Sequence, residues 1–220
     1  MPAKLPKRKP RSLADQVYEY LRGAILMGDI TQGEKIVELD IADQMGTSQG
    51  PVREALQRLS MEGLVERHAR SATYVIELGQ DEMYELFTVR GMIEGLAIRQ
   101  TVKHIDDSKI ALLSGLLAQM REAAEQDNMV QLVTHDLEFH RYLCEWSGRS
   151  GLIRAWLPLY NQIQLFVAQT HKKYFSTLMD IAETHQIIID TLKQKETATA
   201  EAVIKDHVML IWSLIEKQDS

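Results

Sequence analysis

Residues 47–66, TSQGPVREALQRLSMEGLVE, decide how the amino-terminal part of this chain folds. Ser48 is a good helix cap, and Pro51 falls in the first turn, where its missing N–H costs nothing. The apolar side chains that follow share one face: Val52, Leu56 and Leu59. Arg53 and Gln57 lie on the other face. The stretch therefore predicts a helix with one buried side and one polar side.

A shorter helix, from about Glu38 to Met45, precedes this one and ends at Gly46. Two short helices joined by a tight glycine turn form the helix-turn-helix pattern, whose second helix enters the major groove of DNA. A further helix is predicted from Ser12 to about Met27, because Ser12 can cap it and an acidic residue follows three positions later.

Residues 64–78, LVERHARSATYVIEL, alternate loosely between apolar and polar side chains and predict a two-stranded hairpin. Three basic residues lie near its tip: Arg67, His68 and Arg70. A hairpin with incidental charge is the alternative, but its place directly after a recognition-type helix favours a wing that contacts DNA. Residues 1–11 carry five basic residues and no acidic one, which suits either an arm that binds a polyanion or a solvated tail.

These residues resemble the winged helix-turn-helix of the GntR family of bacterial transcription regulators. That family shows a Ser-Arg-Thr-Pro-Val-Arg-Glu-Ala-Leu run, of which this chain keeps Ser48 and residues 51–56 but has Gln49 and Gly50 in place of Arg and Thr. Because arginine reads guanine whereas glutamine prefers adenine or a phosphate, the operator preference is expected to differ. The expected DNA-binding residues are Ser48, Gln49, Gly50, Arg53, Gln57, Arg67, His68 and Arg70.

The rest of the chain reads as helical. Six helices are predicted, at residues 80–103, 107–126, 128–147, 150–174, 177–194 and 196–217. The predicted fold class is therefore mostly α, with an N-terminal winged helix-turn-helix and a C-terminal all-α six-helix bundle. The expected organisation is a basic arm at 1–11, a DNA-binding domain at 12–76 and a helical effector- and metal-binding domain at 80–218.

Asp136 and His140 lie one helical turn apart on an apolar stripe of the helix at 128–147. His185 and His207 fall on apolar faces of the two last helices, His207 beside Leu210. A lone inward histidine is usually a satisfied core residue, but burying three with a carboxylate and no shared partner would be costly. Histidine nitrogen and carboxylate oxygen are typical ligands of divalent transition metals, so a site for zinc, or for nickel, iron or manganese, is predicted.

Four further polar residues are candidates for binding an effector. Arg90 lies on the inward face of its helix, where its partner is either an effector carboxylate or Glu94, one turn away. Asn161, Gln164 and His171 follow helical spacing on the helix at 150–174. They either line the effector pocket or make ordinary buried polar contacts.

The order Asp136-x3-His140, then His185 and His207, resembles the metal-binding version of the FCD domain, the effector-binding half of the FadR subfamily of GntR regulators. Residues 89–100, VRGMIEGLAIRQ, resemble the first-helix motif of that domain, and about six helices rather than seven resemble its VanR-type branch. The resemblance implies that these four residues bind the metal and that an organic-acid effector reaches it.

We therefore expect a ligand-responsive transcription regulator, a repressor, and not an enzyme. Its expected partners are a pseudo-palindromic double-stranded DNA operator, a small carboxylate effector and a second copy of the chain, since one helix-turn-helix covers only a half-site. One alternative is an all-helical metal-dependent hydrolase with an accessory N-terminal domain, and another is a purely structural metal.

The expected compartment is the cytoplasm, without a membrane partner. The single cysteine excludes an internal disulfide and suits a reducing environment. No apolar run approaches the roughly 20 residues of a membrane-spanning helix, and the amino terminus lacks the apolar core of a signal peptide.

Overall fold

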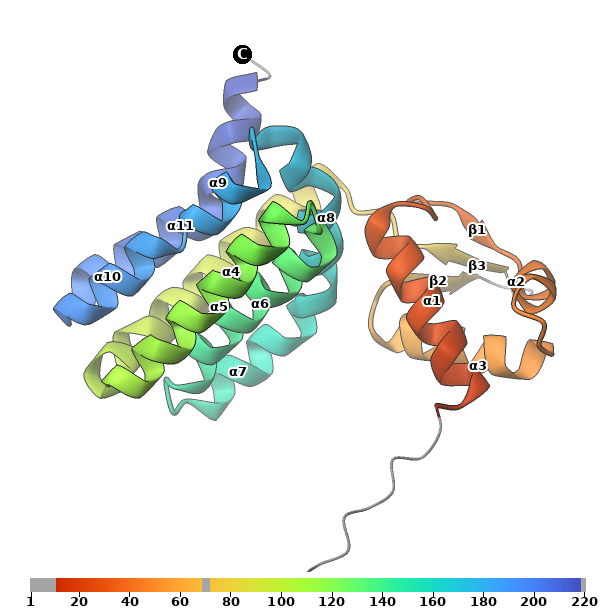
Figure 1. The fold of residues 1–220 in the computed structure, drawn as a ribbon, viewed down its shortest axis with the longest axis horizontal. Coiled ribbons are helices and arrows are strands. Elements are labelled where there is room, and N and C mark those ends of the chain that lie inside the picture. Colours follow the sequence, from red (N-terminus) through yellow and green to blue (C-terminus); the bar gives the residue numbers. More distant parts are fainter. Residues whose placement is uncertain (1–10, 69–71, 219–220) are drawn as a thin grey trace, which may run out of the picture. The chain divides into compact units, whose positions relative to one another are not determined.

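The computed structural model describes residues 11–68 and 72–218, which form two compact units, one made mostly of residues up to Ile76 and the other mostly of residues from Glu77 on (Figure 1). Helices dominate both units, and strands occur only in the first among the described residues. This confirms the predicted fold class, a small winged helix-turn-helix followed by an all-α bundle. Within the described ranges, no helix is both long enough and apolar enough to cross a bilayer.

The first unit consists of α1 (Leu13–Met27), β1 (Lys35–Ile36), α2 (Glu38–Gln44), α3 (Gln49–Met61), β2 (Val65–His68) and β3 (Ala72–Val75). The predicted cap of α1 is present, because the backbone N–H of Asp15 donates to Ser12 Oγ (3.0 Å) and that of Ser12 donates to Asp15 Oδ2 (3.1 Å). The apolar face of α3 is fully buried, as its spacing indicates.

The sheet of the wing has three strands rather than the predicted two. β3 pairs antiparallel with β2 on one side and with β1 on the other. A two-residue strand such as β1 is too short to show an alternation of apolar and polar residues in the sequence. It forms because it can hydrogen-bond to the free edge of β3. Arg70, expected at the wing tip, and residues 1–10 of the expected basic arm lie outside the described residues.

The second unit begins with α4 (Gln80–Thr101), the 3-10 helix η1 (Val102–His104), α5 (Asp107–Glu125) and α6 (Met129–Glu145). It continues with α7 (Ser150–Trp156), the 3-10 helix η2 (Leu157–Leu159), α8 (Tyr160–Tyr174), α9 (Leu178–Glu183), α10 (Gln186–Gln194) and α11 (Thr197–Gln218). α4 packs against both α11 and α6, and α5 packs against α6 (Figure 1).

Two of the six predicted helices are interrupted. The helix expected at 150–174 breaks at η2, where Pro158 supplies no backbone N–H. The helix expected at 177–194 breaks after α9, where Thr184 Oγ donates to the carbonyl of Ile181 (2.6 Å) and His185 Nδ1 approaches the same carbonyl (3.3 Å). Side chains that bond to nearby backbone groups compete with helical hydrogen bonds and favour such a break.

The buried face of α11 differs from the predicted one. Its buried side chains are Ala200, Ile204, Val208, Ile211, Trp212 and Ile215. Leu210, expected inward beside His207, is only half-buried, and so is His207. The difference arises because α11 turns its buried stripe towards α4, which places His207 at the edge of the core.

Candidate functional site

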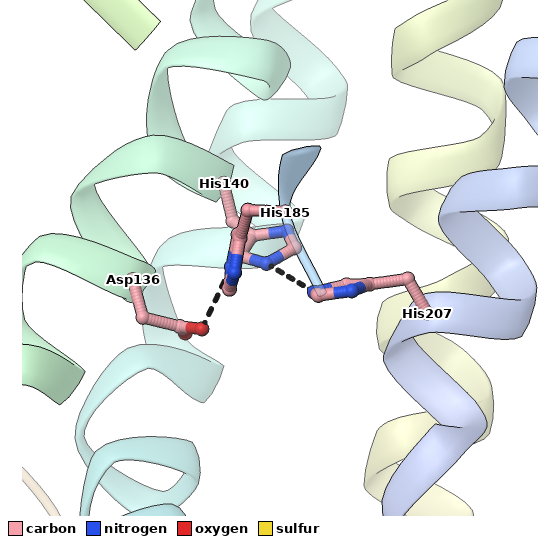
Figure 2. Close-up of side chains that lie close together, drawn as sticks. All are labelled: Asp136, His140, His185 and His207. Carbon is pink, nitrogen blue, oxygen red and sulfur yellow. Dashed lines mark hydrogen bonds and ion pairs between the residues drawn. The ribbon is translucent and has the colours of Figure 1, made fainter. Parts of the chain in front are cut away.

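The four residues predicted to bind metal lie together in the helical unit (Figure 2). Asp136 and His140 come from α6, His185 from the break before α10, and His207 from α11. One possible ligand atom of each lies within 4.8 Å of those of the others. Asp136, His140 and His185 are buried, so the cluster has little access to water.

The ring of His140 is oriented by Glu94 on α4. His140 Nδ1 lies 2.6 Å from Glu94 Oε2, inside the core. An ionised carboxylate only accepts hydrogen bonds, so Nδ1 carries the hydrogen and Nε2 keeps a lone pair. His140 Nε2 lies 3.2 Å from Nε2 of His207, so the lone pair faces the cluster (Figure 2).

His185 is oriented by the backbone at the helix break. Its Nδ1 lies 3.3 Å from the carbonyl oxygen of Ile181 and 3.2 Å from that of Ala182. Carbonyl oxygens only accept, so Nδ1 carries the hydrogen and Nε2 has a lone pair. Nε2 is buried and lies 3.0 Å from Asp136 Oδ1 (Figure 2), but it makes no aligned hydrogen bond within the described residues.

Burial controls the protonation of His140 and His207. It lowers the pKa of His140, against the opposing charge of Glu94, and it lowers the pKa of His207 further, with help from the neighbouring histidines. Both rings are therefore neutral at pH 7, the form that binds metal. Burial alone would raise the pKa of Asp136, but its contact with His185 and the charge of Arg90 outweigh burial and lower it.

This donor set fits a divalent transition metal. One carboxylate and three imidazoles bring oxygen and nitrogen atoms into one buried space, an arrangement that is costly unless a cation lies among them. The Nε2 of His185 is the clearest sign, because it is buried without an aligned hydrogen bond and its ring cannot reorient without losing the backbone carbonyls.

A small cavity adjoins the cluster. Arg90, Asp136, His171, Thr184 and His207 supply its polar lining. Its volume of about 20 Å³ would hold about one water molecule. Arg90 donates through Nε to Glu94 Oε1 (2.7 Å), and no other hydrogen bond from its guanidinium is found within the described ranges. Arg90 thus pairs with Glu94 and also reaches the cavity.

The other three candidates for effector binding do not come together. His171 lines the cavity, and burial lowers its pKa to about 4. Gln164 is buried and donates to Thr134 Oγ (3.3 Å). Asn161 lines a separate open groove, together with Tyr160.

Sequence reasoning missed part of this polar network. Glu94 was expected only as an alternative partner of Arg90, yet it also accepts from Trp156 Nε1 (2.7 Å) and contacts His140. The available signal was the place of Glu94 on the inward face of α4, where a carboxylate must find several donors.

In the first unit, several of the expected DNA-binding residues lie on the exposed side of α3 and on β2. Ser48 precedes α3 as its cap residue, although its side chain makes no capping hydrogen bond, and Gln57 is exposed. Arg53 donates to Glu38 Oε2 (2.6 Å) and to Gln49 Oε1 (2.9 Å). Arg67 approaches the other oxygen of Glu38 at 3.4 Å.

The carboxylate of Glu38 therefore contacts Arg53 of α3 and Arg67 of the wing. Gly50, in the first turn of α3, is exposed as well. His68 lies 2.6 Å from Glu66 on the same strand, also at the surface.

Comparison with known proteins assigns both units. Residues 13–75 match the bacterial regulatory proteins of the gntR family, and residues 85–209 match the FCD domain. A protein of Paenarthrobacter nicotinovorans named "Probable D-xylose utilization operon transcriptional repressor" is 30% identical over 207 residues, which cover 92% of this chain and 88% of that protein. The gluconate operon transcriptional repressor of Bacillus subtilis (strain 168) is 26% identical, over 81% of this chain and 74% of that protein.

Solved structures share the fold. The transcriptional regulator GntR from Rhodococcus sp. RHA1 aligns with a TM-score of 0.74 at 20% identity, over 94% of this chain and 99% of that one. E. coli McbR/YncC aligns with a TM-score of 0.73 at 21% identity, over 96% and 100%. Since both units match and one relative is 30% identical over most of the chain, this protein belongs to the GntR family, as a transcription regulator with an FCD domain.

Proposed function

We propose that this regulator is a metal-containing repressor whose operator affinity changes when a small carboxylate binds its FCD domain. Asp136, His140, His185 and His207 would hold a divalent transition metal. The observation that carries the proposal is their convergence within 4.8 Å, with the Nε2 atom of His185 buried and without an aligned hydrogen bond among the described residues. Three nitrogens and one oxygen suit zinc first, and nickel, iron or manganese where further ligands complete the shell.

The charges of the site support an anionic effector. With a divalent ion bound and the histidines neutral, Asp136 and Glu94 would offset the ion, and Arg90 would leave one positive charge in excess. A carboxylate could then bind the metal and the terminal nitrogens of Arg90, with His171 beside it. The cavity holds about 20 Å³, so we expect a compact acid, admitted by side-chain movement.

Operator binding would use α3 in the major groove and the wing against the backbone or the minor groove. The expected contacts are Ser48, Gln49, Gly50, Arg53 and Gln57 on the helix side, and Arg67, His68 and Arg70 on the wing. The relatives named as operon repressors support a repressor.

A homodimer would present two such helices to a pseudo-palindromic operator. α4 supports this, because Val89, Met92 and Leu96 form an apolar stripe on its outer face and are 45%, 59% and 51% exposed. A stripe of three exposed apolar residues at helical spacing suits burial against a second copy.

Metal content tests the proposal. Tag-free protein purified without chelator would be assayed by elemental mass spectrometry as wild type, His140→Ala and His135→Ala. His135 is a matched control, because it lies on the same helix outside the four-residue cluster. We expect about one metal per chain in wild type and in His135→Ala and little in His140→Ala. A metal-free wild type after reloading with zinc, or full occupancy in His140→Ala, would refute the metal site.

The effector is tested on the metal-loaded protein. Mono- and dicarboxylates, gluconate among them, would be screened by thermal shift and then by DNA binding on fragments that the wild-type protein selects from genomic DNA. A stabilising acid that also changes DNA affinity supports the proposal. If acids stabilise the protein but DNA affinity stays constant, the effector part fails.

A further inference from the structure

Glu94 is a fully buried carboxylate on the inner face of α4, with donors from three helices. Its Oε1 accepts from Arg90 Nε (2.7 Å) and from Trp156 Nε1 (2.7 Å), and its Oε2 accepts from His140 Nδ1 (2.6 Å). Its exposed fraction is 0%. Burying a carboxylate costs free energy unless such donors surround it. The placement of Glu94 among three donors therefore points to a role for this carboxylate beyond packing.

Glu94 is the ionised partner of Arg90 in this setting. The guanidinium is always charged and lies 2.7 Å from Oε1 inside the core, where a buried cation needs an anion beside it. The carboxylate therefore acts only as an acceptor at neutral pH, and each of its three partners must present a hydrogen to it.

The two oxygens of Glu94 act on different groups. Oε2 fixes the hydrogen of His140 on Nδ1, which leaves the Nε2 lone pair for a metal and makes the ring a better donor. Oε1 holds Nε of Arg90, which fixes the guanidinium of a residue that also lines the cavity.

We infer that Glu94 positions His140 for the metal and Arg90 for the carboxylate. This inference rests on the proposed metal site. Glu94 touches neither ligand itself, so its effect passes through the tautomer of His140 and the orientation of Arg90. Outer-shell carboxylates of this kind typically change metal affinity by about 10- to 100-fold.

Glu94→Gln separates the two roles with little loss of shape. Because Arg90 and Trp156 both donate to Oε1, the glutamine oxygen must take that place, and its NH2 group then faces His140 Nδ1. His140 Nδ1 can meet a donor only as an acceptor, which moves its hydrogen to Nε2. The variant therefore favours the tautomer that cannot bind metal through Nε2.

Two readouts test this: the ¹⁵N NMR shifts of the His140 ring in metal-free protein and zinc affinity by chelator competition. We expect Nδ1 protonated in wild type, Nε2 protonated in Glu94→Gln, and zinc binding about 10- to 100-fold weaker in the variant. Trp156→Phe is the control, because it removes a hydrogen bond from the same carboxylate without touching His140. Its zinc affinity should stay within about threefold of wild type.

The outcomes separate the two claims. If wild type binds no zinc, the proposed metal site fails. If wild type binds zinc and Glu94→Gln binds it equally well, only the role of Glu94 fails. If Glu94→Gln does not fold by circular dichroism, the wild-type NMR decides alone, and a His140 hydrogen on Nε2 would overturn the inference.

Discussion

Replacing Arg90 by methionine should destabilise the helical unit strongly at neutral pH. The change removes the guanidinium that lies 2.7 Å from Glu94 Oε1 and leaves a side chain of similar length. Glu94, fully buried, keeps only His140 and Trp156 as partners. Removing one partner of a buried pair costs about 3–5 kcal/mol when the other charge stays.

In the Arg90→Met variant, the carboxylate of Glu94 can limit the loss of stability by taking up a proton. From the ordinary pKa of 4.5, protonation at pH 7 costs about 3.4 kcal/mol, and at pH 5 only about 0.7 kcal/mol. Transfer of the proton to His140 would also be easier at pH 5. The variant takes up a proton on folding whereas wild type does not, so the stability difference should grow with pH, from about 1 kcal/mol at pH 5 to about 3 kcal/mol at pH 7.

Urea unfolding of chelator-treated protein, followed by tryptophan fluorescence, measures this difference. All three tryptophans of the chain lie in the helical unit, so the signal reports that unit alone. Arg90→Lys, which keeps the charge, should lose less than the methionine variant. A loss below about 1 kcal/mol at pH 7, or one that does not shrink at pH 5, would refute the reasoning.

Three further results are expected. Arg53→Ala should weaken binding to the DNA that wild type selects, as measured by a fluorescence titration. If Arg53 contacts a phosphate, the slope of log affinity against log salt concentration should also fall by about one. Unchanged affinity would exclude Arg53 from the interface. Met92→Glu combined with Leu96→Glu should yield a monomer by light scattering with unchanged helix content, and a persistent dimer would place the interface elsewhere. Metal-free wild type should lose stability as the pH falls from 6.5 to about 4, because His171 takes up a proton at a higher pH in the unfolded chain than in the folded one. The stability of His171→Gln should fall less steeply over this range. Equal slopes of stability against pH would contradict this assignment.

Local periodicity was enough to predict which parts of the chain are mainly helical and the stripe that carries Asp136 and His140. Residues four apart on a helix share a face whatever surrounds them, so their placement needs no tertiary information. The recognition helix was predictable for the same reason, since its buried face and the proline in its first turn are both local signals.

Long-range contacts explain what the sequence did not reveal. The bond between Trp156 and Glu94 joins residues 62 positions apart, and that between His140 and Glu94 spans 46. The orientation of His185 depends on the break between α9 and α10, whereas periodicity alone predicts one continuous helix there. Gln164 and Asn161 follow the spacing expected of pocket residues, but η2 and the packing of α8 direct them elsewhere.

Under the proposed function, the two roles of Arg90 limit how the effector choice of this regulator could be changed. Arg90 lines the cavity and also neutralises Glu94. Replacing Arg90 alone to accept an uncharged effector would leave the charge of Glu94 unpaired in the core and destabilise the helical unit. Thr184 and His171 also line the cavity, and neither carries a full charge at neutral pH. Libraries that alter inducer choice would therefore start at these two positions and treat Arg90 and Glu94 as a unit to be exchanged together.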